Sequence, residues 1–140
     1  MNAKEFLKRY EYALYAAERA RRNYELEMER IDAIGSALGG DGQPHGTGVS
    51  RKTEDKAIRL VEKASAWLDA EEKAQIVLEE MTDFINSIPG IEGVVLHQRY
   101  ILLLGWKEIA DNLAYTESGI FKVRTRALEI VERMLSDESN

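Results

Sequence analysis

Hydrophobic residues recur at alternating three- and four-residue intervals along the N-terminal segment of the chain. Residues 3–34 contain neither Gly nor Pro and are rich in Ala, Glu, Arg and Leu, which favour helices. This spacing is typical of a coiled-coil seam. The expected seam positions are Leu7, Tyr10, Leu14, Ala17, Arg21, Tyr24, Met28 and Ile31. We therefore expect one long helix that needs a partner helix, with Arg21 as a charged interruption of its contact surface.

A second long helix is predicted over residues 51–88, with Ser50 or Thr53 as its cap and Pro89-Gly90 as its end. Its expected seam positions are Ala57, Val61, Ala64, Leu68, Gln75, Leu78, Thr82 and Ile85, with Glu71 as a charge on the seam. Residues 35–50, GSALGGDGQPHGTGVS, have the Gly and Pro content of a flexible connection. Two helices of similar length joined in this way most simply form an antiparallel hairpin.

Residues 91–104 form the next predicted helix, and apolar side chains occur all round it. We expect this helix to be buried, with Tyr100 as a core aromatic residue. His97 lies in the same segment without a second His or a nucleophile nearby in the sequence, so we expect a core or surface imidazole there.

Two further helices are predicted, joined by a tight turn. The first covers residues 106–113, and its apolar stripe is Trp106, Ile109, Ala110 and Leu113. The pattern breaks at Ala114 and Tyr115, after which Thr116 is placed to cap the second helix. The apolar positions of that helix are Ile120, Val123, Ala127, Leu128, Val131 and Leu135.

The outward face of this last helix carries the main functional signal. Between residues 118 and 128 there are three basic residues and no acidic ones, although the chain as a whole has a net charge of -6. A short basic helix that follows another helix and a tight turn is the element that helix-turn-helix proteins place in the DNA major groove. We therefore predict a DNA-binding surface here.

The run WKEIADNLAYTESGIFKVRTRAL, residues 106–128, resembles region 4 of sigma-70-type factors. The matching positions are Glu108-Ile109-Ala110, Thr116, Ile120 and Arg126-Ala127-Leu128, preceded by Leu96, Arg99 and Tyr100. Together with the upstream helices, the chain is similar to small phage-encoded regulators of Gram-positive bacteria related to the ArpU and RinA type of late-gene regulators. Two positions depart from the pattern, since Ala114 replaces the usual turn Gly and Gly119 lies early in the last helix.

The resemblance implies a sequence-directed transcriptional regulator of phage or prophage type. The residues expected to contact DNA are Lys107, Thr116, Ser118, Phe121, Lys122, Arg124, Thr125 and Arg126. Hydroxyls near the start of the helix would hold phosphate. Lys122 and Thr125 would face base edges, and the arginines would neutralise backbone charge. Phe121 would either touch a thymine methyl group or pack on the hairpin.

The composition of the chain argues against several other classes of protein, namely metalloproteins with thiolate ligands, enzymes and membrane proteins. The chain of 140 residues has no Cys, so thiolate metal sites and disulfides are impossible. We expect no cofactor and no enzymatic activity, because no GxxxxGK[ST], HExxH or Ser-His-Asp spacing occurs. No apolar run is long enough to cross a membrane, and a cytoplasmic location in a bacterial host is expected.

The expected organisation is all-α. Residues 1–90 would form the hairpin for self-association, with the Gly-rich loop at 35–50, residues 91–135 the three-helix DNA-binding unit, and residues 136–140 a tail. The expected partners are double-stranded DNA and a second copy of the chain, as a homodimer or higher homo-oligomer. Two alternatives stay open: a small terminase subunit that marks DNA for packaging, and a sigma-like module that docks on RNA polymerase.

Overall fold

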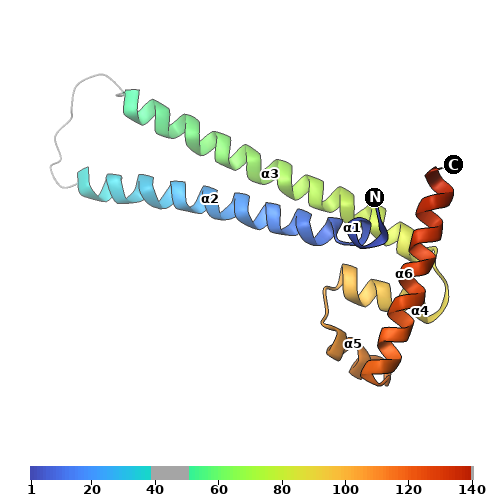
Figure 1. Cartoon of the computed structure of the whole chain (residues 1–140). Coiled ribbons are helices and arrows are strands. Elements are labelled where there is room, and N and C mark those ends of the chain that lie inside the picture. The colour runs from blue at the N-terminus through green and yellow to red at the C-terminus, as the bar shows by residue number, and fades with distance from the viewer. Residues whose placement is uncertain (39–50, 140) are drawn as a thin grey trace. The chain divides into compact units, whose positions relative to one another are not determined.

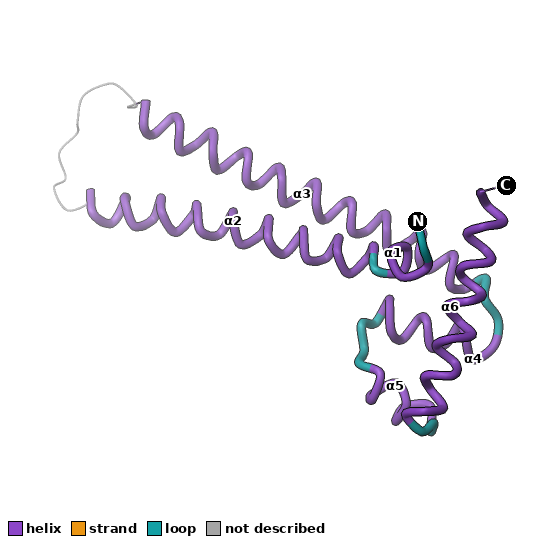
Figure 2. Tube along the Cα trace, viewed as in Figure 1, coloured by secondary structure: helices purple, strands orange, loops and turns teal. Residues whose placement is uncertain are grey.

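The computed structural model describes residues 1–38 and 51–139, and this part of the chain is all-α (Figures 1 and 2). The helices are α1 (Ala3–Leu7), α2 (Arg9–Leu38), α3 (Arg51–Asn86), α4 (Gly90–Leu96), a π-helical turn η1 (His97–Ile101), α5 (Trp106–Leu113) and α6 (Glu117–Ser139). The expected all-α class is thus confirmed.

The chain divides into two compact units. One consists of Leu14–Lys73, and the other combines Met1–Ala13 with Ala74–Asn140. The second unit therefore contains one end of each long helix together with α1, α4, η1, α5 and α6. The functional division expected near residue 90 stays a prediction.

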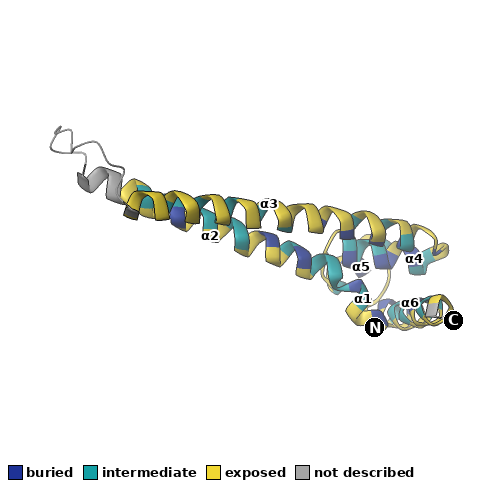
Figure 3. Cartoon of the chain, turned by 90° about the horizontal axis from the view of Figure 1, so that it is seen from above, coloured by how far each residue is buried: buried dark blue, intermediate teal, exposed yellow. Residues whose placement is uncertain are grey.

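Within the Leu14–Lys73 unit, α2 and α3 lie side by side and run antiparallel (Figures 1 and 3). The ring of Tyr24 on α2 lies 5.4 Å from that of Trp67 on α3, centroid to centroid. Ala17, which the heptad spacing placed on the α2 seam, is buried, and Tyr24, Met28 and Ile31 are partly buried. The spacing along α2 therefore predicted its contact face.

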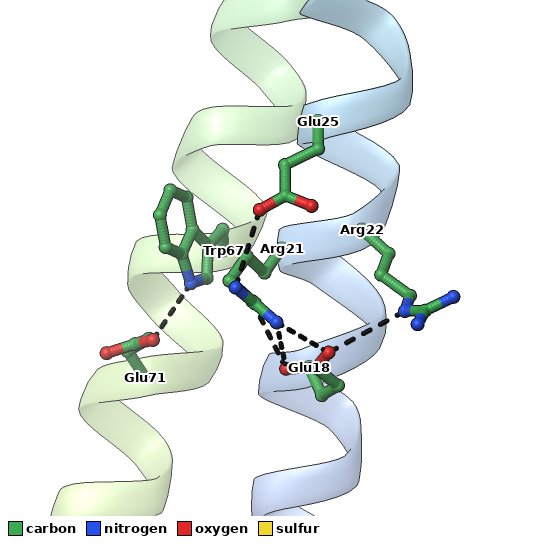
Figure 4. A network of polar contacts seen from close by, with 6 residues as sticks. All are labelled: Glu18, Arg21, Arg22, Glu25, Trp67 and Glu71. Atoms are coloured by element: carbon green, nitrogen blue, oxygen red, sulfur yellow. Dashed lines mark hydrogen bonds and ion pairs between the residues drawn. The ribbon is translucent and has the colours of Figure 1, made fainter.

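The charges on this contact face are paired along each helix (Figure 4). Arg21 Nη2 lies 2.7 Å from Glu18 Oε1, and Arg21 Nη1 lies 3.4 Å from Glu25 Oε1. Glu71 accepts a hydrogen bond from Trp67 Nε1 at 2.9 Å. The two charged interruptions are thus satisfied by neighbours three or four residues away.

The expected seam of α3 was right at some positions and wrong at others. Ala64, Leu78 and Thr82 are partly buried and Ile85 is buried, as expected. Val61 and Leu68 are 67% and 68% exposed, and Ala57 and Gln75 are also exposed. Among the buried and partly buried positions that the heptad spacing did not include are Leu60, Lys63, Trp67, Ala70, Ala74, Val77 and Met81. Apolar residues occupy both phases of the heptad repeat, so periodicity alone could not tell which positions of α3 are buried.

The other unit has two apolar clusters. One joins α1, α3, α4, η1 and α6, and its buried residues are Ala3, Leu7, Val77, Met81, Ile85, Ile88, Leu96, Tyr100, Ala127 and Val131. The second joins α4, α5 and α6 through Val95, Ile109, Ala110, Ile120 and Val123. These clusters hold the first half of α6 against α4 and α5, so one side of α6 is buried and the other is left to solvent.

The short helix α1 is fixed to the same core. Asn2 and Glu5 form a capping box, with the Glu5 N–H donating to Asn2 Oδ1 at 2.9 Å. The N–H of Ala3 donates to Glu132 Oε1 on α6 at 2.7 Å. The Phe6 and Phe84 rings, which lie 4.6 Å apart, add an aromatic contact between α1 and α3.

Several expected boundaries differ from the structure. The first helix is interrupted at Lys8 and then continues to Leu38, while residues 39–50, including most of the Gly-rich loop and His45, lie outside the described residues. The predicted tail is helical as far as Ser139. The helix expected over residues 91–104 ends as a π-helical turn at Ile101.

We expected the helix over residues 91–104 to be buried on all sides, and this expectation was also wrong. Val94, Leu102 and Leu103 are 42%, 54% and 37% exposed. Leu103 adopts a φ of 59°, a left-handed conformation that reverses the chain before α5. Within α4, Gly93, Val95 and Leu96 are buried and Val94 is exposed, so only one side of this helix meets the core.

Candidate nucleic-acid interface

The turn between α5 and α6 is closed by backbone hydrogen bonds. Ala114 has φ 57° and ψ 40°, the left-handed conformation that commonly ends a helix. The Tyr115 N–H donates to the Ala110 carbonyl at 2.9 Å. A side chain in this conformation costs about 1–2 kcal/mol, which explains why Gly is the usual residue at such positions. The departure noted at Ala114 therefore strains the turn.

Thr116 caps α6, as the sequence predicts. Its Oγ1 accepts a hydrogen bond from the Gly119 N–H at 3.0 Å. A Cβ atom at Gly119 would lie 3.0 Å from the same oxygen and 3.3 Å from Tyr115 Cδ1. The glycine early in this helix thus leaves room for the cap.

The solvent-facing side of α6 carries most of the expected DNA-contacting residues. Ser118, Lys122 and Thr125 are exposed, and Phe121 is 45% exposed. The Thr125 hydroxyl donates to the Phe121 carbonyl at 3.0 Å, so its oxygen lone pairs stay free to accept. Glu117, in the first turn, is also exposed and places a negative charge at the end of the helix where phosphate was expected to bind.

Phe121 packs toward α5 instead of standing alone. Its ring lies 6.3 Å from that of Trp106, and Arg124 Cζ lies 5.9 Å from the Phe121 ring centre. Arg124 Cζ is also 5.2 Å from the Trp106 ring centre. These distances are in the range of cation–π contacts. Phe121 is therefore part of an aromatic and cationic cluster at the junction of α5 and α6.

Arg126 has a carboxylate partner. Its Nε donates to Glu92 Oε1 on α4 at 3.2 Å. This ion pair offsets the charge that was expected to neutralise DNA backbone phosphate. Lys107, on α5, is exposed. The structure therefore brings Phe121 and Arg124 together with Trp106, and directs Arg126 toward α4.

A groove of about 800 Å³ runs along the flank of α6 beside α1. Its lining residues come from α1 and α6 and are Lys4, Phe121, Arg124, Thr125, Leu128, Glu129, Glu132 and Arg133. Glu129 and Glu132 share the C-terminal part of the groove with Arg133, so this part carries charges of both signs.

The sequence reasoning treated Trp106 only as a core residue and did not use Arg99 as a site residue. Arg99 Cζ lies 5.2 Å from the Trp106 ring centre, and Arg99 Nη1 donates to the Leu104 carbonyl at 3.0 Å. The two residues are seven apart and belong to different helices, so no helical periodicity links them. Their contact arises from the chain reversal after η1.

No group of three or more His, Asp or Glu side chains suited to a metal ion occurs among residues 1–38 and 51–139. None of the described helices combines the length and apolar character needed to cross a membrane. Comparison of the chain with protein-family models, with curated proteins and with solved structures finds no match.

Proposed function

We propose that the protein is a sequence-directed DNA-binding regulator of transcription, of phage or prophage type, acting in the bacterial cytoplasm. The observation that carries the proposal is the exposed face of the first turns of α6, where Ser118, Lys122 and Thr125 face solvent. This face follows α5 and a short turn, the order of elements that helix-turn-helix proteins use. The resemblance of residues 106–128 to sigma-70 region 4 supports the same function.

In this proposal the first half of α6 enters the major groove. Lys122 can donate to guanine O6 or N7, and the Thr125 hydroxyl oxygen can accept from a base amino group. The Thr116 and Ser118 hydroxyls and Lys107 contact phosphates, while Arg124 neutralises backbone charge. We assign Phe121 to packing against Trp106, because its ring already has that neighbour.

Self-association is the second part of the proposal. One short helix reads few base pairs, so two copies on two half-sites would raise both affinity and specificity. Support comes from α3, where Ile58, Val61 and Leu68 are 55%, 67% and 68% exposed at near-heptad spacing. This spacing suits a helix of a second copy, giving a homodimer or a higher homo-oligomer.

Selection of bound sequences from a random duplex pool tests the DNA-binding proposal. The purified protein is used at about 150 mM salt, since affinities depend strongly on salt. We expect an enriched site, with two half-sites about 10 base pairs apart if the protein dimerises. Lys122→Ala should abolish the enrichment, whereas Glu138→Ala, at an exposed position near the end of α6, should keep it.

Light scattering after size-exclusion chromatography tests self-association. Leu68→Glu should reduce the molar mass to that of one chain, and Ala66→Glu, at an exposed position on another side of α3, should not. A wild-type protein that is monomeric at micromolar concentration contradicts this part. Ring-shaped oligomers would point to the terminase alternative, and binding to RNA polymerase without binding to duplex would point to a docking module.

A further inference from the structure

Two arginines from different helices share one aromatic ring in the α4–α6 region. Trp106 begins α5, Arg99 belongs to η1 and Arg124 to α6. Both guanidinium Cζ atoms lie 5.2 Å from the centre of the Trp106 ring. Each contact is favourable, but placing two positive charges around a single ring has an electrostatic cost.

The cluster has no anion of its own. Among the residues that the structure describes, neither Arg99 nor Arg124 has a carboxylate partner, whereas the nearby Arg126 is paired with Glu92. Arg124 Nε is buried and has no hydrogen-bond partner. An unpartnered buried donor on a charged group is costly, so the surroundings of Arg124 leave its charge only partly compensated.

The two side chains are also held in place before any ligand binds. Arg99 is fixed by its hydrogen bond to the Leu104 carbonyl, and Arg124 lies against both Trp106 and Phe121. A guanidinium group has five N–H donors in a planar fork that matches an oxyanion. Because little side-chain entropy remains to be lost, such a group binds phosphate more tightly than a free surface arginine.

We propose that Arg99 and Arg124, positioned by Trp106, contact DNA backbone phosphates, so that the interface extends from α6 to η1. This inference rests on the proposed DNA binding and adds to it a backbone contact by Arg99. DNA is the favoured source of the oxyanion because Arg124 lies on the same first turns of α6 as Lys122. A carboxylate of a protein partner would be the competing source.

The salt dependence of binding tests the proposal. Affinity of the wild-type chain, Arg99→Gln and Arg133→Gln is measured on the selected duplex and on a random duplex, between about 50 and 200 mM salt. Each lost phosphate contact should reduce the slope of log K against log salt by about 0.9. We expect this reduction for Arg99→Gln on both duplexes, and a wild-type slope for Arg133→Gln, whose exposed side chain lies on the later turns of α6.

The fluorescence of Trp106 provides a second measurement, which needs no substitution of Arg99, Arg124 or Trp106. The chain has two Trp residues, so Trp67→Phe makes Trp106 the only one. Saturation of this variant with duplex should change the Trp106 emission. An unchanged emission, or an Arg99→Gln slope equal to that of wild type, overturns the proposal.

The outcomes separate this inference from the proposed function. If the wild-type chain binds no duplex, both fail. If Lys122→Ala loses binding while Arg99→Gln behaves like Arg133→Gln, only the inference fails. If Arg99→Gln loses binding to RNA polymerase and keeps the duplex slope, the cluster belongs to a protein interface, and the phosphate assignment is overturned.

Discussion

Arg126 on α6 donates from Nε to Glu92 Oε1 on α4 across 3.2 Å. The sequence assigned Arg126 to DNA backbone phosphate, but its guanidinium is directed to a carboxylate 34 residues away in the chain. Three basic residues on this part of α6 therefore have three different surroundings. Lys122 faces solvent, Arg124 stacks on aromatic rings, and Arg126 is paired.

Glu92→Gln tests the role of this pair. The pair is partly exposed, so its loss should lower the free energy of unfolding by no more than about 1 kcal/mol. Freed from its partner, Arg126 should then raise the affinity for duplex DNA at low salt. Urea denaturation and duplex titration measure the two effects, and a weaker binding of duplex by the variant would contradict the expectation.

Ala114→Gly should stabilise the protein by about 1 kcal/mol. The residue has a φ of 57°, where an L side chain is strained and glycine is not. Urea denaturation gives the free energy of unfolding. Ala66→Gly, in an exposed helical position of α3, is the control and should instead lose about 1 kcal/mol.

Gly93→Ala should destabilise the protein by about 1–3 kcal/mol, through overpacking. A Cβ atom built at Gly93 clashes with the Ile88 carbonyl oxygen, so α4 would have to move. Gly105→Ala is the matched control, because nothing lies within 4 Å of its added Cβ atom. Equal stability of the two variants in thermal or urea unfolding would show that α4 does not approach the end of α3 this closely.

The observed burial along α3 is tested by a pair of truncations. Met81→Ala removes a fully buried side chain and should cost about 2–5 kcal/mol. Gln75→Ala, at a position that the heptad spacing had placed on the seam, should change the free energy of unfolding by less than about 0.5 kcal/mol because Gln75 is exposed. A larger loss for Gln75→Ala than for Met81→Ala would contradict the observed burial of these two positions.

Tyr100 should make the protein sensitive to alkaline pH. Burial raises the pKa of its hydroxyl above the ordinary value, and Arg124 and Arg99 oppose the shift. The unfolded chain therefore releases this proton first, so the free energy of unfolding falls as the pH rises from about 10 toward the folded-state pKa. Tyr100→Phe should remove this part of the decline between pH 9 and 11, as followed by urea denaturation at each pH.

The control for this pH series is Tyr12→Phe. Tyr12 is 57% exposed, so its substitution should leave the alkaline decline as in the wild-type chain. A Tyr100→Phe variant with an unchanged decline would show that other groups cause it.

The sequence by itself determined the kind and order of the helices. Helix-forming residues without Gly or Pro, and apolar positions three and four apart, sufficed for α2, α3, α5 and α6, because helix formation and amphipathicity depend on near neighbours in the chain. The Thr116 cap followed from the same local rules. The exposed face of α6 could be predicted in the same way, because the apolar residues Ile120, Val123 and Ala127 identify the buried face.

Tertiary structure decided what depends on contacts between distant segments. Apolar residues of α3 occur in two phases of the heptad repeat, and packing leaves Val61 and Leu68 exposed while Trp67 is partly buried. The pairing of Arg126 with Glu92 and the sharing of Trp106 by Arg99 and Arg124 need the chain reversal after η1, which no periodicity specifies. Periodicity shows which face of a helix is apolar, but the partner of that face is selected by the packing of the whole unit.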